Sequence, residues 1–240
     1  MSYSEIKKGE MIEAIVLAGG MGKRLQKVVA DLPKPMAPVK GKPFLFYLFN
    51  WLRQYPVDKI ILSVGYRYES IIEYFGKIFE SVLIDYAVEE EPLGTGGAVL
   101  NSLKRIKGKH TLILNGDTWF PIDINKFLAF HTESKSEFSV ALKKMKNFSR
   151  YGSVEMSSDT IVRFNEKKHC EEGYINGGIY LVSRDFFDSR EYPRIFSLEK
   201  DVLVREAGKS ELKGIVFDTP FIDIGIPEDY KRAESVIRIE

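Results

Sequence analysis

The stretch EAIVLAGGMGKRL, residues 13–25, joins a continuous apolar run to a loop that holds three glycines and two adjacent cations. An uninterrupted apolar run of this length is typical of a strand buried on both faces of a parallel sheet. A glycine loop after such a strand commonly presents backbone N–H groups to phosphate. The stretch therefore predicts a parallel α/β sheet with an anion-binding loop behind one of its strands.

Strand-like and helix-like runs alternate along the chain after this stretch. The helix-like runs PFLFYLFNWLRQYP, YESIIEYFGKIF and GGAVLNSLKRI alternate with the strand-like runs KIILSVG, VLIDYAV and HTLILNGD. This alternation predicts a Rossmann-like, mixed and mainly parallel sheet flanked by helices. After residue 137, short strand-like runs with turns such as SSD predict a smaller antiparallel β-rich lobe. FIDIG then gives a last strand, and Pro227 opens a last helix. We expect one domain over residues 1–240, with parts at 12–136 and 137–240.

Composition narrows the class of protein. Of the 240 residues, 44% are hydrophobic and 29% charged, which is ordinary for a globular protein. Thirty-five basic against thirty-four acidic residues give a formal net charge of +1, which is too small to hold a nucleic acid by bulk charge. The single cysteine, Cys170, allows no internal disulfide and suits a reducing cytoplasm. MSYSEIKKGE lacks the apolar core of a signal peptide, and FLFYLFNWL is too short to span a bilayer. We therefore expect a cytoplasmic protein without nucleic-acid or membrane partners.

The glycine loop fails two well-known phosphate-binding patterns. A Walker A loop would need Ser or Thr after Gly22-Lys23, where the chain has Arg24. A dinucleotide fingerprint would need a third glycine, where the chain has Leu25. What remains is Gly-Gly-x-Gly-x-Arg-Leu, whose two cations suit a polyphosphate better than a single phosphate. From the loop alone, a tight strand-to-helix turn with solvated cations stays an equal alternative.

Three further residues are candidates for phosphate or metal chemistry. Lys34 lies between two prolines, which restrict where its ammonium can point, although a surface lysine would also fit. Asp117 ends a strong apolar strand, at the edge where α/β sheets bind ligands, although an aspartate that caps the next turn would look the same. Asp223 stands between isoleucines, where a carboxylate is costly to bury without a partner. A metal ion shared by Asp117 and Asp223 would provide that partner.

The three histidines and the cysteine show no pattern of a catalytic or metal site. His110, His131 and His169 lack metal-ligand spacing, and His131 is expected to be structural or solvated. His169 and Cys170 belong to KHCEEG, which is interpreted as a charged hairpin loop. A thiol nucleophile is disfavoured because nothing near it in the sequence orients a base.

Seven motifs taken together resemble one enzyme family. LAGGMGKRL, PKPM, LGTGGA, NGDT, FNEK, NGGIYLV and FIDIGIPEDY occur in an order and spacing similar to those of the sugar-1-phosphate nucleotidyltransferases, over residues 12 to 238. Within that family, the short length and FSLEKDVL resemble the bacterial D-glycero-D-manno-heptose 1-phosphate guanylyltransferases. We do not expect the left-handed β-helix that some relatives append for acetyl transfer. The resemblance implies transfer of a nucleotidyl group from a nucleoside triphosphate, expected to be GTP, to a sugar 1-phosphate.

The resemblance also implies roles for residues in the first part of the chain. Arg24 would stabilise the departing pyrophosphate, and Lys34 would contact the α-phosphate and the incoming sugar phosphate. Asp117 and Asp223 would hold Mg²⁺. Lys23 stands where relatives often carry Thr or Ser, so its role stays open. The remaining nucleotide contacts are expected from Leu17, Ala18, Gly19, Gly20, Met21, Gly22, Lys23, Gly94 and Thr95.

The second part of the chain is expected to hold the sugar 1-phosphate. Glu166 would accept hydrogen bonds from sugar hydroxyls, and Lys167 would pair with the phosphate. Asn176, with Gly177 after it, would reach another hydroxyl, and Gly152 would line the same site. The partners are thus small molecules, with a homodimer expected from the family. Mannose, glucose or N-acetylmuramic acid phosphates with GTP, CTP, UTP or dTTP stay open, among them a mannose-1-phosphate guanylyltransferase, as does a non-catalytic nucleotide-sugar-binding regulator.

Overall fold

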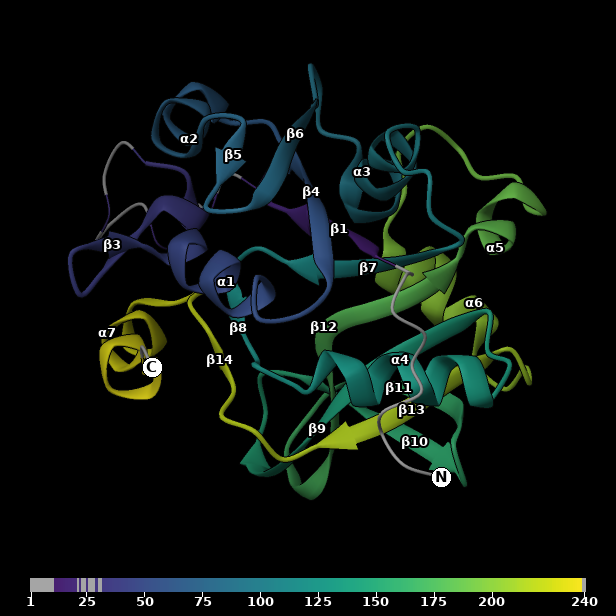
Figure 1. Cartoon of the computed structure of the whole chain (residues 1–240). Helices are drawn as coiled ribbons and strands as arrows, with labels where there is room; N and C mark the ends of the chain where they lie inside the picture. The colour runs from purple at the N-terminus through teal and green to yellow at the C-terminus, as the bar shows by residue number, and fades with distance from the viewer. Residues whose placement is uncertain (1–10, 21, 23–24, 26–28, 30–31, 239–240) are drawn as a thin grey trace.

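The structure is a computed structural model of the chain that describes residues 11–20, 22, 25, 29 and 32–238. These residues build a ten-stranded sheet in the order β10-β11-β13-β9-β12-β7-β1-β4-β6-β5 (Figure 1). The centre of the sheet is parallel, as the apolar runs predict. Its four parallel strands are β1 (Ile12–Leu17), β4 (Val57–Val64), β6 (Val82–Val88) and β7 (His110–Asn115).

Helices cover both faces of this parallel centre. Side chains along β1 alternate between two hydrophobic clusters, with Ala14 and Val16 in one and Ile15 in the other. The first cluster is covered by α1 (Phe44–Leu52), α2 (Tyr68–Phe75), α4 (Ile124–Glu133) and α7 (Pro227–Val236), and the second by α3 (Gly94–Leu103), α5 (Arg184–Asp188) and η3 (Leu198–Leu203). Figure 1 shows α1 and α3 on opposite sides of β1. In the described ranges, no helix is both long and apolar enough to cross a membrane.

The antiparallel lobe continues the same sheet. Strand β12 pairs with β7 along one edge and with β9 along the other, both antiparallel, and therefore joins the lobe to the parallel centre. This confirms the predicted mixed α/β fold with added antiparallel strands. The lobe consists of β9 (Phe138–Phe148), β10 (Gly152–Ser157), β11 (Thr160–Lys167), β12 (Cys170–Ser183) and β13 (Leu212–Phe217). One pairing departs from the predicted antiparallel pattern, because β13 runs parallel to β9.

Several predicted elements differ in extent from the structure, and two of them show the physical reason. The helix predicted over YESIIEYFGKIF ends at Phe75, because Gly76, with a φ of 61°, stops it, and Ile78–Phe79 form the edge strand β5. The charged loop predicted at KHCEEG is shorter, since β12 begins at Cys170 and pairs there with Phe148 of β9. Charged residues at the end of an exposed strand give the same sequence pattern as a loop.

A small ribbon carries the end of the chain back to the carboxyl end of the parallel strands. Strand β14 (Ile222–Asp223) pairs antiparallel with β8 (Thr118–Trp119), which follows β7 directly. Figure 1 shows β14 and α7 beside α1, although the chain separates them widely. The remaining short elements are η2 (Lys34–Met36), β2 (Pro38–Val39), β3 (Lys42–Pro43) and α6 (Val204–Glu206).

Two histidines that are far apart in the sequence meet at the amino end of β7. His131 on α4 is buried, with Nδ1 2.8 Å from the Ser139 hydroxyl and Nε2 3.2 Å from Nδ1 of His110. Burial, helped by the charge that His110 can carry, lowers the pKa of His131 to about 4. His131 is therefore a structural group that is neutral near pH 7.

We expect this histidine to make the protein less stable in acid. Between about pH 6.5 and pH 4 the unfolded chain protonates His131 and the folded chain does not, so the free energy of unfolding should fall by about 3 kcal/mol as the pH drops through that window. Urea unfolding at pH 7 and pH 4.5 measures the fall, which His131→Gln should reduce. The exposed His169→Gln serves as control. An unchanged pH dependence in His131→Gln would refute the assignment.

Candidate active site

The glycine loop lies at the carboxyl end of β1 and forms one wall of a cavity of about 480 Å³. Ala18 N–H donates to the Ser63 carbonyl, which extends the pairing of β1 with β4 to the start of the loop. At Gly19 a Cβ would lie 2.8 Å from Oε1 of Glu89, so a larger residue would displace that carboxylate. Gly22 has a φ of +57°, the left-handed region that favours glycine. The loop thus brings bare backbone to the cavity wall.

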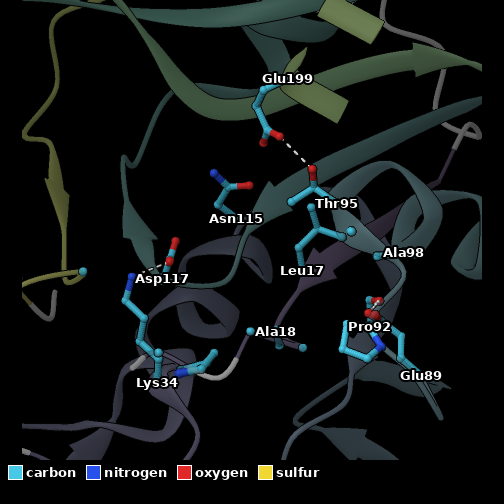
Figure 2. Close-up of a pocket in the computed structure, with 17 residues that line it drawn as sticks. Leu17, Ala18, Lys34, Glu89, Pro92, Thr95, Ala98, Asn115, Asp117 and Glu199 are labelled. Atoms are coloured by element: carbon cyan, nitrogen blue, oxygen red, sulfur yellow. Dashed lines mark hydrogen bonds and ion pairs between the residues drawn. The ribbon is translucent and has the colours of Figure 1, made fainter. Parts of the chain in front are cut away.

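The cavity gathers residues that are far apart in the sequence (Figure 2). Its volume lies in the usual range for small-molecule sites. The lining consists of Leu17, Ala18, Gly19, Gly20, Gly22, Lys34, Pro35, Ser63, Glu89, Pro92, Gly94, Thr95, Ala98, Asn115, Asp117, Glu199 and Gly225.

One end of the cavity holds a cation between two carboxylates. Lys34 Nζ donates to Oδ2 of Asp117 at 2.5 Å and to Oδ1 of Asp223 at 3.3 Å. The lysine side chain is only 12% exposed, whereas Asp117 and Asp223 are 33% and 26% exposed. The residues chosen from the sequence as candidates for one site are therefore brought together, and they remain open to a ligand.

Pairing of β8 with β14 explains why these two aspartates meet. Thr118 lies opposite Asp223 in the ribbon, and Ile224 N–H donates to the Asp117 carbonyl at 3.0 Å. Asp223 is oriented further by Gly225 N–H, which donates to its Oδ1 at 2.8 Å. Backbone pairing thus fixes the positions of both carboxylates.

The Asp117–Asp223 pair fits a hard divalent cation. The two carboxylates already converge on one positive group, the ammonium of Lys34. Among the described residues, no cluster of three or more His, Cys, Asp or Glu side chains forms a complete metal cage. Two carboxylates with substrate phosphates and water are the usual surroundings of Mg²⁺, which rarely occupies an all-protein cage.

The other end of the cavity is formed where α3 begins. Gly94 has a φ of +72°, and a Cβ there would lie 2.4 Å from the Phe196 carbonyl oxygen. Thr95 Oγ1 donates to Oε2 of Glu199 at 2.6 Å, a contact marked in Figure 2, and accepts from Leu198 N–H at 2.9 Å. Gly94 and Thr95, both expected from the sequence to contact the nucleotide, therefore line the cavity. Sequence reasoning missed Glu199, although FSLEKDVL had been singled out.

The residues expected to bind the sugar lie outside this cavity wall. Glu166 and Lys167 are exposed at the end of β11. Asn176 donates to the Tyr180 hydroxyl at 2.9 Å and accepts from Gly178 N–H. Burial raises the pKa of Tyr180, which therefore stays a neutral hydroxyl.

Two predicted sugar-site glycines have packing reasons of their own. A Cβ at Gly152 would lie 2.3 Å from the Asn165 carbonyl oxygen, at a register shift between β10 and β11. A Cβ at Gly177 would lie 2.5 Å from the Phe120 ring. These contacts require glycine whether or not a sugar binds. Met21, Lys23 and Arg24 lie outside the described residues.

Tyr151 lies next to Gly152 and close to the carboxylate end of the cavity, and sequence reasoning missed it. Burial and the charge of Asp223 raise its pKa to about 12, so it is a neutral hydroxyl near pH 7. Arg150 forms an ion pair with Asp229 of α7. That ion pair ties the β9–β10 connection to the helix that follows Asp223.

Gly22→Ala should lower the free energy of unfolding by about 1–2 kcal/mol, because alanine is strained at positive φ. Its Cβ would also lie 2.8 Å from Cβ of Lys34, so the lysine would have to shift. Gly20→Ala is the matched control, since no described atom lies within 4 Å of a Cβ there. Urea unfolding of the two variants measures the difference. Equal stabilities would show that the backbone at residue 22 relaxes freely.

Three comparisons identify what the chain is similar to. The family model described as Nucleotidyl transferase matches residues 13–238. The D-glycero-alpha-D-manno-heptose 1-phosphate guanylyltransferase of Aneurinibacillus thermoaerophilus is 43% identical over 227 residues, which cover 95% of this chain and 99% of that protein. The protein of the same name from Campylobacter jejuni is 43% identical over 91% of this chain and 97% of its own. The crystal structure of HddC from Yersinia pseudotuberculosis complexed with GMP-PN has a TM-score of 0.83 at 36% identity, covering 94% of this chain and 99% of that one.

Proposed function

The chain belongs to the nucleotidyl transferase family, and we propose that it transfers a guanylyl group from GTP to D-glycero-D-manno-heptose 1-phosphate, releasing pyrophosphate. The observation that carries the reaction class is the meeting of the glycine loop with Lys34, Asp117 and Asp223 at one cavity. The support for guanine and heptose is the 43% identity to two guanylyltransferases over nearly their whole length.

The chemistry requires cations and fixed donors rather than a general base. A phosphate oxygen of the sugar 1-phosphate attacks the α-phosphorus of GTP, and the bond from that phosphorus to the leaving pyrophosphate breaks. The attacking oxygen is already an anion, so no proton has to be removed. Charge grows on the α-phosphoryl and leaving oxygens, where Lys34 and the loop amides of Gly19 to Gly22 can stabilise it. Arg24 would stabilise pyrophosphate through its planar pair of donors.

Enzymes of this family use a divalent metal, and we propose Mg²⁺ for this chain. Asp117 and Asp223 would hold it, and when bound it would neutralise charge on the triphosphate. In the structure the ammonium of Lys34 occupies the position between these carboxylates. The same lysine can contact phosphate oxygens once a metal satisfies the two aspartates.

We propose that each of the two parts of the chain binds one of the two substrates. We assign residues 12–136 to the nucleotide, with Gly94 and Thr95 against the base, and 137–240 to the sugar phosphate. Glu166, Lys167 and Asn176 stay candidates for sugar contacts, together with Gly152 and Gly177. Neighbouring strand residues point to opposite faces, so Glu166 and Lys167 can reach one ligand only where the strand ends. The end of β11 at Lys167 supports this proposal.

Lys167→Ala should raise the KM for sugar 1-phosphate about 10-fold or more and leave the KM for GTP nearly unchanged, because the ammonium would contact only the sugar phosphate. Glu166→Gln should change the ranking among sugar 1-phosphates, since it alters a hydrogen-bond acceptor. Lys168→Ala, at an exposed neighbouring lysine, is the control. If all three variants keep wild-type kinetics with every sugar, Glu166 and Lys167 lie outside the sugar site.

A pyrophosphate-release screen tests the proposed function directly. GTP, CTP, UTP and dTTP are each combined with the 1-phosphates of D-glycero-D-manno-heptose, mannose, glucose and N-acetylmuramic acid. The proposal expects the highest kcat/KM for GTP with the heptose. Faster turnover of another pair would reassign the substrate, and no release with any pair would favour a nucleotide-sugar-binding regulator.

The substrates and the family likeness support proposals for the enzyme's cellular location, partners and oligomeric state. We propose a cytoplasmic location, supported by the need for nucleoside triphosphates and by the single cysteine. The substrates are small molecules, so no nucleic-acid or membrane partner is proposed. A homodimer is proposed from the family likeness, and sedimentation equilibrium would measure it.

A further inference from the structure

Asp229 is a buried carboxylate in the first turn of α7, the helix that follows Asp223 in the chain. Its side chain is only 10% exposed. Each of its oxygens accepts from one arginine, Oδ2 from Arg150 and Oδ1 from Arg232 at 3.0 Å. A carboxylate removed from water needs such partners, because an unpaired buried charge is costly. None of the proposed catalytic roles uses either arginine.

The two arginines differ in what they connect to Asp229. Arg232 lies one turn further along α7, is 66% exposed and pairs with Asp229 within the helix. Exposed pairs of this kind contribute little to the position of a helix. Arg150 belongs instead to the connection between β9 and β10, in the antiparallel lobe. Its ion pair therefore joins the lobe to a helix that packs on the parallel centre of the sheet.

The same connection holds the chain on the other side of Asp223. The ring of Tyr151 contacts the ring of Phe221 edge-on, with centroids 5.7 Å apart. Phe221 in turn contacts the ring of Phe120, which follows β8, with centroids 5.5 Å apart. The connection between β9 and β10 thus contacts the chain before Asp223 through Phe221 and after it through Asp229.

The first turn of α7 is also fixed from the parallel half of the molecule. The Tyr230 hydroxyl donates to the carbonyl of Pro38, shortly after η2, which begins at Lys34. The path from this turn back to the carboxylate is short, since Pro227 opens the helix and Gly225 N–H donates to Asp223. A displacement of the first turn would therefore move Asp223.

We infer that Arg150 is a positioning residue, whose ion pair with Asp229 couples the binding of sugar 1-phosphate at the lobe to the binding of metal at Asp223. This inference rests on the proposed nucleotidyl transfer, which places a sugar contact at Gly152, directly after Arg150 and Tyr151. A ligand that orders this connection would order the chain around Asp223 with it. By linkage, a metal held at Asp223 would favour the ligand by the same factor.

Arg150 also has a charge, and the effect of that charge has to be separated from positioning. Burial alone would lower the pKa of Arg150, but its hydrogen bond to Asp229 and the charge of Asp223 are among the effects that raise it. Arg150 thus lies within the field of the Asp223 carboxylate. A positive charge there repels a metal ion, so its removal alone would tighten metal binding. Loss of positioning would weaken metal binding instead.

The first experiment removes the ion pair without changing the net charge. The double variant Arg150→Met/Asp229→Asn loses one positive and one negative charge. Mn²⁺ binding to the substrate-free protein, measured by electron paramagnetic resonance, should weaken about 5-fold in the double variant and in each single variant. Tighter binding in Arg150→Met together with wild-type affinity in the double variant would show an effect of charge alone and overturn the inference.

Matched variants separate the connection to the lobe from the pairing of Asp229 as such. Arg232→Met removes the other arginine from the same carboxylate and should leave the Mn²⁺ affinity unchanged. Arg150→Lys keeps the charge and should lose less affinity than Arg150→Met. Tyr151→Leu removes the ring contact with Phe221, should weaken Mn²⁺ binding and keeps the test decisive if Arg150→Met folds poorly. An equal loss in Arg232→Met and Arg150→Met would overturn the inference.

The second experiment measures the coupling itself. Heptose 1-phosphate is titrated by calorimetry into protein saturated with the α,β-methylene analogue of GTP, which cannot be cleaved, at low and at high magnesium. Magnesium should raise the sugar affinity of the wild type about 5-fold or more, and clearly less in Arg150→Met/Asp229→Asn. An equal rise in both proteins would overturn the coupling. Absence of sugar binding would contradict the proposed function, whereas an unchanged Mn²⁺ affinity in the double variant would contradict this inference.

Discussion

Asp117→Ala should lower kcat about 1,000-fold or more at saturating magnesium and substrates, with little change in the midpoint of thermal unfolding. Asp117 and Asp223 converge on one cation site, and phosphoryl transfer depends on cations that neutralise charge growing on phosphate oxygens. The backbone at Asp117 is fixed by pairing with the chain around Ile224, which does not need the carboxylate. Loss of turnover should therefore not reflect loss of the fold.

Asp223→Ala should behave in the same way, and a chelator should abolish wild-type activity. Asp218→Asn is the control, because its carboxylate is 91% exposed and pairs only with Lys143 among the described residues. Steady-state kinetics across a magnesium titration, together with thermal unfolding, provides the measurement. Full activity of both alanine variants would remove the metal from these two aspartates.

Lys34→Met should lower kcat about 100-fold and at the same time tighten the binding of a divalent metal to the nucleotide-free protein. In the structure the Lys34 ammonium lies between Asp117 and Asp223, where it repels a second cation. Methionine keeps the bulk of the side chain and removes that charge. The turnover falls because the phosphates lose a fixed positive partner, whereas the aspartates gain room for a metal.

Titration calorimetry with Mg²⁺ or Mn²⁺ measures the metal affinity, and steady-state kinetics measures turnover. Lys126→Met, at a lysine on α4 that does not line the cavity, should change neither quantity. The test depends on the expected opposite changes, tighter metal binding with slower turnover. A general loss of structure would weaken both metal binding and catalysis. If Lys34→Met binds metal more weakly, the lysine does not compete for the aspartate site.

The sequence alone predicts the fold class well, because the signal is local. Uninterrupted apolar runs of strand length alternate with helical ones, and only a sheet covered on both faces buries all of them. Glycines in a loop after such a strand likewise mark a turn with exposed amides, whatever the rest of the chain does. The ends of individual helices and strands were predicted less well. Gly76 ended α2 four residues before the predicted end, since a single residue at positive φ stops a helix that periodicity would continue.

At the site, too, the sequence predicted what local chemistry determines and missed what depends on distant parts of the chain. Residue type and position along the chain marked three residues for three different reasons: Lys34 is restrained by two prolines, Asp117 ends a strand at the edge where ligands bind, and Asp223 stands between isoleucines and needs a partner. Their meeting was decided by the pairing of β8 with β14, which joins segments that no local pattern relates. Glu89 and Glu199 were missed because acidic residues in loops and at helix ends usually face solvent. Only the tertiary structure shows them lining the cavity.

The sequence by itself thus determined which strands are buried, where the phosphate loop falls and which charged residues need partners, since each follows from chemistry within a few neighbouring residues. The tertiary structure decided which residues meet: Lys34 with two aspartates, Ser63 with Glu89, and His131 with His110. Strand order and register fix these contacts, and both depend on the packing of the whole chain. A side chain's partner is therefore a property of the fold, whereas its need for a partner can be seen in the sequence.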